Sequence, residues 1–258
     1  MILASLGSGS KGNCTLISTN TENILVDCGI PEKTIVEGLR KLSLCVNDID
    51  AILITHEHSD HISSLKKLMN KYDIPAYASY GTISNISDSD NMNFFVIQAD
   101  SEFYIGNTMV TPFRTYHDTP GPLGYRLEQE AAVCGKDTAV CVLTDCGHYD
   151  EYIKSHLRNL DAMLIEANHN IDMLMTGPYP MFLKRRIFSD NGHASNISCG
   201  RLLDEIRSDR LKGVLLGHLS EVNNDPYIAL KEVLTEFPPC GVKVSVAPQN
   251  GISEVITL

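Results

Sequence analysis

The sequence predicts one α/β domain in which antiparallel hairpins are combined with helix crossovers. Short apolar runs rich in β-branched residues alternate with amphipathic stretches along the 258 residues of the chain. The opening of the chain contains only strand-like runs, whereas helical and strand-like stretches mix afterwards. No linker rich in proline, glycine or serine divides the chain. We therefore expect residues 1–258 to form a single domain.

The expected strands are short apolar runs, and the expected helices are stretches in which apolar residues recur at helical spacing. Ile35, Leu39 and Leu42 recur in this way in the first helix. In chain order, strands are expected at residues 1–6, 14–18, 23–27, 51–55, 94–98, 109–114, 123–127, 138–144, 162–166, 213–216, 242–247 and 252–258. Helices are expected at residues 32–42, 63–71, 149–157, 180–187, 196–206 and 226–237.

The composition excludes several classes of protein. The chain has 21 lysines and arginines against 32 aspartates and glutamates, and its net charge of −11 excludes binding of nucleic acid through bulk positive charge. No apolar run reaches the ~20 residues that span a membrane, and the first residues do not resemble a signal peptide. None of the eight cysteines forms a C-x-x-C pair. We expect a reduced, cytoplasmic protein.

The strongest functional pattern is T-H-E-H-S-D-H at residues 55–61, directly after an apolar run. Neutral imidazole and carboxylate are the usual ligands of zinc and similar metals. His56 and His58 alternate in an extended segment and so point to the same side. Asp60 and His61 come after the turn and can face a second ion. The segment therefore predicts a metal site.

Three further polar residues, His117, Asp145 and His218, each follow an apolar strand-like run. Because side chains at the same end of several strands converge, we expect these residues to complete the metal site. One short pattern also occurs twice, as L-V-D-C-G at residues 25–29 and L-T-D-C-G at 143–147. The repetition is either a chance match or the mark of two related halves.

The order H-x-H-x-D-H, followed by histidine, aspartate and histidine, resembles the metallo-β-lactamase superfamily. The resemblance implies a four-layer αββα sandwich, with mixed sheets inside and helices outside, and two divalent metal ions at one edge. Zinc is the expected metal, with manganese or iron as alternatives. Asp27 would support the metal loop. One ion would be held by His56, His58 and His117, and the other by Asp60, His61 and His218, with Asp145 bridging the two.

Two later segments, E-A-N-H at residues 166–169 and G-H-A-S-N at 192–196, resemble the tRNase Z group of phosphodiesterases. The resemblance implies that His193 protonates the leaving oxygen and that Glu166 orients His193. Asp60 is expected to orient the attacking water as well as to bind metal. True β-lactamases of this fold usually have cysteine or serine in the place of Asp145, so antibiotic hydrolysis is not expected.

Nearly the whole chain resembles the YycJ/WalJ family of metal-dependent nucleases, for which DNA exonuclease activity is the leading suggestion. The stretch between His117 and Asp145 is too short for the arm with which typical tRNase Z enzymes grip tRNA. Asn170 and Ala194 stand where members of the family often have aspartate and leucine. The segments that carry the resemblance are residues 6–13, 166–169, 177–180, 184–187, 218–220 and 223–224.

A nucleic-acid substrate requires local positive charge in this acidic chain. Residues 181–219 carry more basic than acidic side chains, and a basic cluster precedes His193. A solvated helix face is the alternative interpretation of that cluster. Of the tyrosines, Tyr116, Tyr125 and Tyr179 lie near site residues in the sequence, and they either stack on bases or simply pack. The expected substrate-binding residues are Asn168, His169, Lys184, Arg185 and Arg186.

Two alternative functions stay open. Another hydrolase of the same fold, a thioesterase or lactonase, would use the same metal ligands but would not need residues 192–196 or the basic cluster. A non-catalytic, metal-binding regulatory partner is the second alternative, and the complete ligand set argues against it. The sequence leaves open whether the substrate is DNA or RNA, the direction of cleavage and the oligomeric state.

Overall fold

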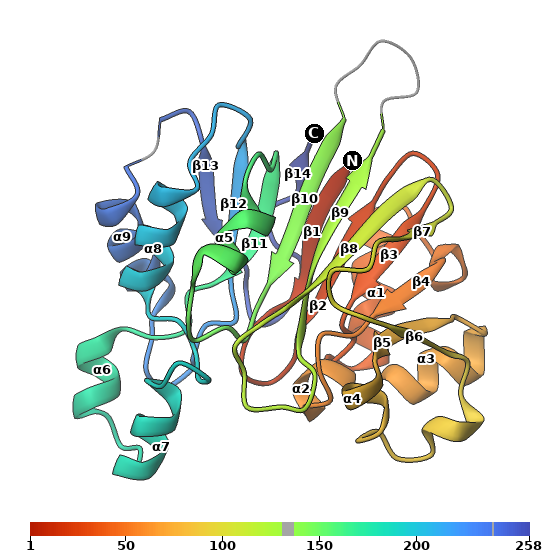
Figure 1. Ribbon diagram of the computed structural model, residues 1–258, viewed down its shortest axis with the longest axis horizontal. Helices are drawn as coiled ribbons and strands as arrows, with labels where there is room; N and C mark the ends of the chain where they lie inside the picture. The colour runs from red at the N-terminus through yellow and green to blue at the C-terminus, as the bar shows by residue number, and fades with distance from the viewer. Residues whose placement is uncertain (131–136, 239) are drawn as a thin grey trace.

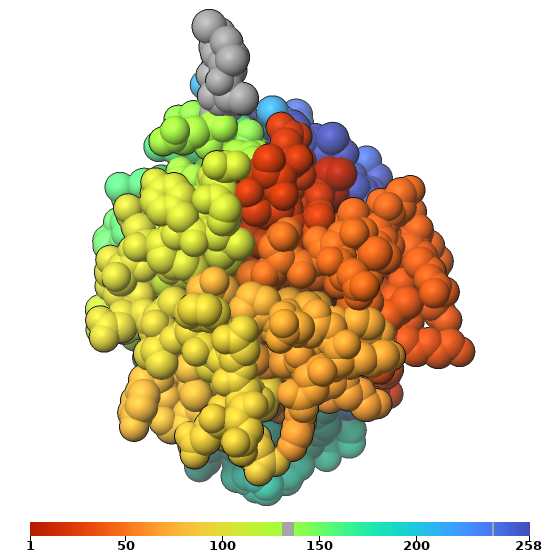
Figure 2. Space-filling model, turned by 90° about the vertical axis from the view of Figure 1, so that its right-hand side faces the viewer, coloured from red at the N-terminus to blue at the C-terminus, as the bar shows by residue number. Residues whose placement is uncertain are grey.

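Two mixed sheets packed face to face form the centre of the computed structural model, which describes residues 1–130, 137–238 and 240–258 (Figure 1). Within these residues each sheet has seven strands. Figure 2 shows the side of the molecule that is built mainly by the first part of the chain, in red to yellow, with teal residues at its lower edge. No helix in the described ranges combines the length and the apolar character needed to cross a membrane.

The first sheet has the order β14-β1-β2-β3-β4-β5-β6. Its first strands, β1 to β3, are antiparallel, and β3 to β6 are parallel. The last strand of the chain, β14, pairs antiparallel with β1. The strands are β1 (Ile2–Gly7), β2 (Cys14–Ser18), β3 (Asn23–Val26), β4 (Ala51–Leu53), β5 (Ala76–Ser79), β6 (Phe94–Ile97) and β14 (Ile256–Thr257).

The second sheet repeats this plan, with antiparallel strands from β7 to β10 and parallel strands from β10 to β13. Parallel strands end at the same edge of a sheet, so the residues that follow β3 and β4, or β10, β11 and β12, can meet there. The strands are β7 (Phe103–Ile105), β8 (Thr108–Arg114), β9 (Leu123–Gln129), β10 (Thr138–Leu143), β11 (Ala162–Glu166), β12 (Gly213–Gly217) and β13 (Lys243–Val246).

Apolar side chains fill three layers of core. Between the sheets, Ile17 and Leu53 of the first belong to the same buried cluster as Val110 and Leu127 of the second. Further clusters lie under α1 (Glu32–Lys41) and α3 (Leu65–Tyr72) on the first sheet, and under α5 (Glu151–Leu157), α8 (Asn196–Glu205) and α9 (Pro226–Glu236) on the second. The arrangement is the expected four-layer αββα sandwich with helices outside.

The elements that the sequence did not predict are all short. β5 reads A-Y-A-S, which has little β-branched character, and it is a strand because β4 and β6 pair with it on either side. The strand expected over residues 252–258 is present only as β14, which has two residues. The other unpredicted elements are β7, α2 (Ser59–Ile62), α4 (Tyr80–Ile83), α6 (Ile171–Thr176) and the 3-10 helices Val46–Asp48 and Ser89–Asn91.

Candidate metal centre

The T-H-E-H-S-D-H segment forms the loop after β4 and the short helix α2, at the lower centre of Figure 1. His56 is fully buried, and its Nε2 lies 2.9 Å from Nδ1 of the half-buried His58. His117, which follows β8 of the second sheet, brings Nε2 to 3.4 Å from that same atom of His58. Burial lowers the pKa of His56 and of His117, and this favours the neutral imidazole that binds metals.

A second group of possible ligands comes from α2 and from the end of β12. Oδ2 of Asp60 lies 3.4 Å from Nε2 of His61 and 3.5 Å from Nε2 of His218. His218 has a φ of 53°, in the left-handed region that residues other than glycine rarely adopt. Such conformations cluster at functional sites, where the surrounding structure holds them in place.

Asp145 lies between the two groups, directly beyond the end of β10. Its Oδ2 is 3.2 Å from Nε2 of His61 in the second group. Its Oδ1 is 3.8 Å from Nε2 of His117 in the first group and 3.6 Å from Nε2 of His218. The position of this buried carboxylate therefore allows it to contact ions held by either group.

The buried polar atoms of the site fit a divalent cation. Within the part of the chain that the structure describes, Oδ2 of Asp145 and Nε2 of His218 are buried and neither makes a hydrogen bond. Leaving such an atom unpaired costs about 1–3 kcal/mol, and a bound cation would remove that cost. In each of the two groups the ligand atoms lie within 4.8 Å of one another, and the imidazole and carboxylate donors suit zinc and similar metals.

Two buried carboxylates, Asp27 and Glu166, each contact Nδ1 of a histidine whose Nε2 faces the second ligand group. Oδ2 of Asp27 lies 2.7 Å from Nδ1 of His61, and Thr55 donates hydrogen bonds to both oxygens of Asp27, from its backbone N–H and its hydroxyl. Burial alone would lower the pKa of His61, but the carboxylates of Asp27 and Asp145 raise it to about 10. Asp27 thus lies on the side of His61 opposite to the ligand atom Nε2.

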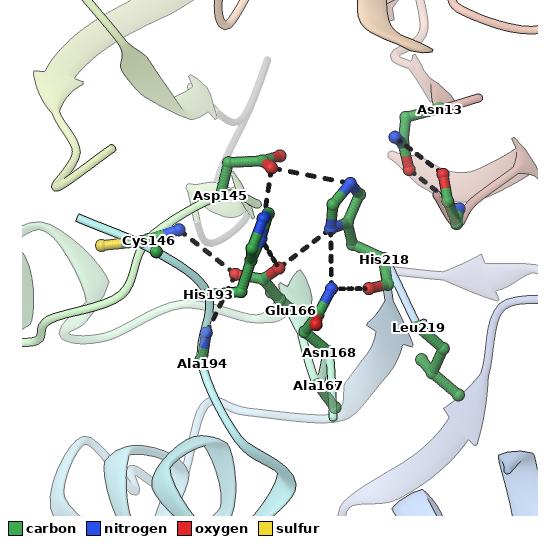
Figure 3. A network of polar contacts seen from close by, with 12 residues as sticks. Asn13, Asp145, Cys146, Glu166, Ala167, Asn168, His193, Ala194, His218 and Leu219 are labelled. Atoms are coloured by element: carbon green, nitrogen blue, oxygen red, sulfur yellow. Dashed lines mark hydrogen bonds and ion pairs between the residues drawn. The ribbon is translucent and has the colours of Figure 1, made fainter. Parts of the chain in front are cut away.

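Glu166, at the end of β11, supports two histidines at once (Figure 3). Its Oε1 lies 2.8 Å from Nδ1 of His193 and 2.9 Å from Nδ1 of His218. Its Oε2 accepts hydrogen bonds from the backbone N–H groups of Cys146 and Ala194. Burial raises the pKa of Glu166, but the two histidines outweigh burial and lower the pKa to about 2.

A cavity of about 370 Å³ opens onto these groups. His193 is half-buried and lines the cavity, and its Nδ1 lies 3.5 Å from Oδ1 of Asp145. The walls of the cavity come from segments that follow strands of both sheets and from the connection that contains α7 (Met181–Ile187). The structure therefore brings together all seven expected metal ligands with His193 and Glu166.

The expected substrate-binding residues are divided. Asn168 and Arg186 line the cavity, and Arg185 is exposed outside it. Lys184 is buried and donates to the backbone carbonyl of Met175, so its ammonium group is turned into the fold. His169 is also buried and does not line the cavity, and within the described residues its two ring nitrogens lack hydrogen-bond partners.

The three tyrosines that lie near site residues in the sequence also differ in position. Tyr179 lines the cavity. Tyr125 is fully buried between the sheets and donates its hydroxyl hydrogen bond to the carbonyl of Ile54, so it packs rather than stacks. Tyr116 donates to Asp150 and lies outside the cavity lining.

Asp118 is a cavity residue that sequence reasoning did not select. Its Oδ1 lies 3.5 Å from Nε2 of His117, and its Oδ2 accepts a hydrogen bond from Nε of Arg186. The available signal was its position directly after His117. Ser10, Asn191 and Ser220 also line the cavity. Ser10 and Ser220 belong to segments that carry the family resemblance, but their own side chains were not selected, and Asn191 lies in none of those segments.

A sandwich of two mixed sheets with a histidine and aspartate cluster at one edge defines a class of proteins. Residues 22–216 match the family described as "Beta-lactamase superfamily domain", and the chain belongs to that family. The solved structure of the metallo-β-lactamase fold protein YhfI from Bacillus subtilis has a TM-score of 0.71 to this chain. That comparison covers 98% of each chain at 18% sequence identity, and it confirms the fold.

Within this family the chain is similar to two named nucleases over most of its length. It is 34% identical to exodeoxyribonuclease YycJ of Bacillus anthracis, over 88% of this chain and 86% of the relative. It is 33% identical to exodeoxyribonuclease WalJ of Streptococcus pneumoniae, over 93% of this chain and 90% of the relative. A weaker similarity, 26% identity over 44% of this chain and 42% of the relative, links it to ribonuclease Z of Methanopyrus kandleri. The expected relationship to the YycJ/WalJ family is confirmed.

Proposed function

We propose that the protein is a divalent-metal-dependent phosphodiesterase that removes nucleotides from the ends of DNA. One observation carries the proposal. Glu166 holds His193 beside Asp145, so that an imidazole outside the two ligand groups faces the same cavity. The two exodeoxyribonucleases similar to this chain over most of its length support DNA as the substrate.

The pair of Glu166 and His193 is suited to donate a proton. Because Nδ1 of His193 faces Glu166, the transferable proton is on Nε2. Burial would lower the pKa of His193, but the Glu166 carboxylate outweighs burial and raises it. A sugar oxygen that leaves phosphorus needs a proton, whereas a thiolate leaves readily without one. The pair therefore favours a phosphodiester over a thioester.

We assign the two ligand groups to two divalent cations, with zinc favoured over manganese or iron. When bound, such cations neutralise charge on phosphate oxygens and supply water with a lowered pKa. Asp60 lines the cavity and is assigned the orientation of the attacking water in addition to metal binding. The first ion is assigned to His56, His58 and His117, and the second to Asp60, His61 and His218, with Asp145 contacting both.

For the substrate, we assign phosphate contacts to Asn168 and Arg186, which line the cavity, and to the exposed Arg185. His169 and Lys184 are buried and are assigned a supporting part instead. Because the ligands come from both sheets, we treat residues 1–258 as one catalytic unit. A reducing, cytoplasmic setting agrees with the cysteines of the described residues, which are free.

Digestion of end-labelled DNA and RNA tests the proposal. The protein is stripped with a chelator and reconstituted separately with zinc, manganese or magnesium, and a thioester and a lactone are assayed in parallel. We expect metal-dependent release of nucleotides from DNA and no hydrolysis of the thioester or lactone. Hydrolysis of the thioester or lactone without cleavage of DNA would contradict the proposal. Bound metal without any hydrolysis would favour the regulatory alternative.

A further inference from the structure

The segment that contains α6 and α7 exposes an unusual amount of apolar surface. Met175, Met181, Phe182 and Phe188 are each between half and three-quarters exposed. The two helices lie at the lower edge of the molecule in Figure 1, apart from α8 and α9. Apolar side chains gathered on one projecting segment of a soluble fold usually mark a binding surface.

The same segment forms one wall of the cavity. Tyr179, Leu183 and Arg186 line it, so α7 has one face toward the candidate site and another toward solvent. Phe182 lies in the first turn of α7 and is 75% exposed. Residues three and four apart on a helix are neighbours at about 5–6 Å, which places Phe182 next to Arg185 and Arg186.

The charge of this edge favours a polyanion. Among the residues that the structure describes, the guanidinium of Arg185 has no ion-pair or hydrogen-bond partner. Arg186 is held at the cavity by Asp118, with its guanidinium at the mouth of the site. A free cation and a tethered cation next to Phe182, with Tyr179 lining the same cavity as the tethered cation, match the arrangement by which proteins bind single-stranded nucleic acid.

We infer that Tyr179, Phe182, Arg185 and Arg186, called here the α7 edge, bind unpaired nucleotides next to the phosphate that is cleaved. Bases stack on the two aromatic rings while their phosphates meet the arginines. Base faces are available to such rings only where the strand is single or frayed, since they are covered in a duplex. The inference rests on the proposed function and narrows its substrate to ends with unpaired nucleotides.

Phe182→Ala tests the α7 edge against Tyr227→Ala as a matched control. Tyr227 is 73% exposed on α9 and does not line the cavity. Each variant is assayed on a single-stranded oligodeoxynucleotide and on the same strand with abasic residues at its end, which keep the phosphates and lack the bases. Stacking is worth about 1–3 kcal/mol per base.

We expect Phe182→Ala to lower kcat/KM on the normal strand roughly tenfold relative to the wild-type protein. On the abasic strand, kcat/KM of the variant should be close to that of the wild-type protein. Tyr227→Ala should match the wild-type protein on both strands. An equal loss on both strands would overturn the stacking inference. So would a change of oligomeric state in sedimentation experiments, since the edge would then be an interface between copies of the chain.

Hydrolysis of bis(p-nitrophenyl) phosphate by the wild-type protein separates this inference from the proposed function. If the wild-type protein with metal hydrolyses neither this small diester nor DNA, the proposed function fails. If it hydrolyses both and Phe182→Ala behaves like Tyr227→Ala, only the α7 edge fails.

Arg185→Gln gives a second variant. We expect the slope of the logarithm of the DNA-binding constant against the logarithm of salt concentration to become shallower by about one. An unchanged slope would remove Arg185 from the edge.

Discussion

The two L-x-D-C-G segments end matching strands, β3 and β10, yet their aspartates have different surroundings. Asp27 and Asp145 are both buried, with φ of 60° and 54°. Both oxygens of Asp27 accept hydrogen bonds from Thr55. Oδ2 of Asp145 makes no hydrogen bond to any described residue, although it lies 3.2 Å from Nε2 of His61. In these two otherwise similar segments, an acceptor atom that makes no hydrogen bond marks the carboxylate that can face a metal, and a fully hydrogen-bonded carboxylate marks the one that supports.

The glycines of the two segments match more closely. A Cβ added to Gly29 would lie 1.6 Å from the backbone oxygen of Asp60, and one added to Gly147 would lie 2.5 Å from that of Ser189. In each half, glycine lets the backbone of a segment that carries site residues pack against the end of a strand.

Asp145→Ala gives the largest expected effect. The carboxylate contacts both ligand groups, so we expect loss of turnover and fewer bound metal ions per chain. Metal analysis and DNA digestion measure the two effects. Full metal content in an inactive variant would show that Asp145 is not a ligand.

His193→Ala tests the second half of the molecule without touching a proposed ligand. We expect turnover to fall by roughly 10²–10⁴ with metal content retained, because a general acid contributes about that much. In the variant, Glu166 still contacts His218, so the second ligand group keeps its supporting carboxylate. The metal content of the variant therefore serves as the internal control. Loss of metal would instead assign His193 to the ligands.

Asp27→Asn tests the supporting carboxylate. Partners of metal ligands typically contribute about 10–100-fold to metal affinity, so we expect metal binding to weaken by that factor while excess metal restores activity. Competition with a chelator measures the affinity. If saturating metal fails to restore turnover, Asp27 does more than hold His61, and the contrast with Asp145 breaks down.

Glu22→Gln gives the smallest effect and concerns the edge of the sandwich away from the site. Burial opposes ionisation of Glu22, but hydrogen bonds from the Asn107 N–H and the Thr108 hydroxyl outweigh it and lower its pKa. Because the pKa of Glu22 is lower in the folded protein than in the unfolded chain, its ionisation stabilises the fold at pH values above the unfolded-state pKa of about 4.3. This stabilisation is lost as the pH falls through the folded-state pKa.

We therefore expect wild-type Tm to exceed that of Glu22→Gln above about pH 5, with the difference disappearing in acid. Thermal unfolding of metal-free protein from neutral to acid pH measures this. A difference that stays constant with pH would show that ionisation of Glu22 does not contribute.

Hydrophobic periodicity predicted most strands and helices, because long apolar faces are visible locally. β5 and α2 were not predicted, since a four-residue element is decided by its neighbours. The side chain of Lys184 shows the same limit. In the sequence it belongs to a basic cluster with Arg185 and Arg186, but the helix turns Lys184 into the fold and Arg186 toward the cavity.

By itself the sequence determined the α/β class and the set of polar residues that end apolar strands, because these are properties of local pattern, and the order of its motifs carried the resemblance to the family. Only the tertiary structure decided which of those polar atoms stay free. Asp27 is satisfied by Thr55, which lies 28 residues away in the chain, and Asp145 meets histidines from both sheets. Hydrogen-bond satisfaction depends on neighbours brought together by packing, so the two L-x-D-C-G segments taken alone do not distinguish the supporting carboxylate from the one that can face a metal, and only their place in the order of motifs did.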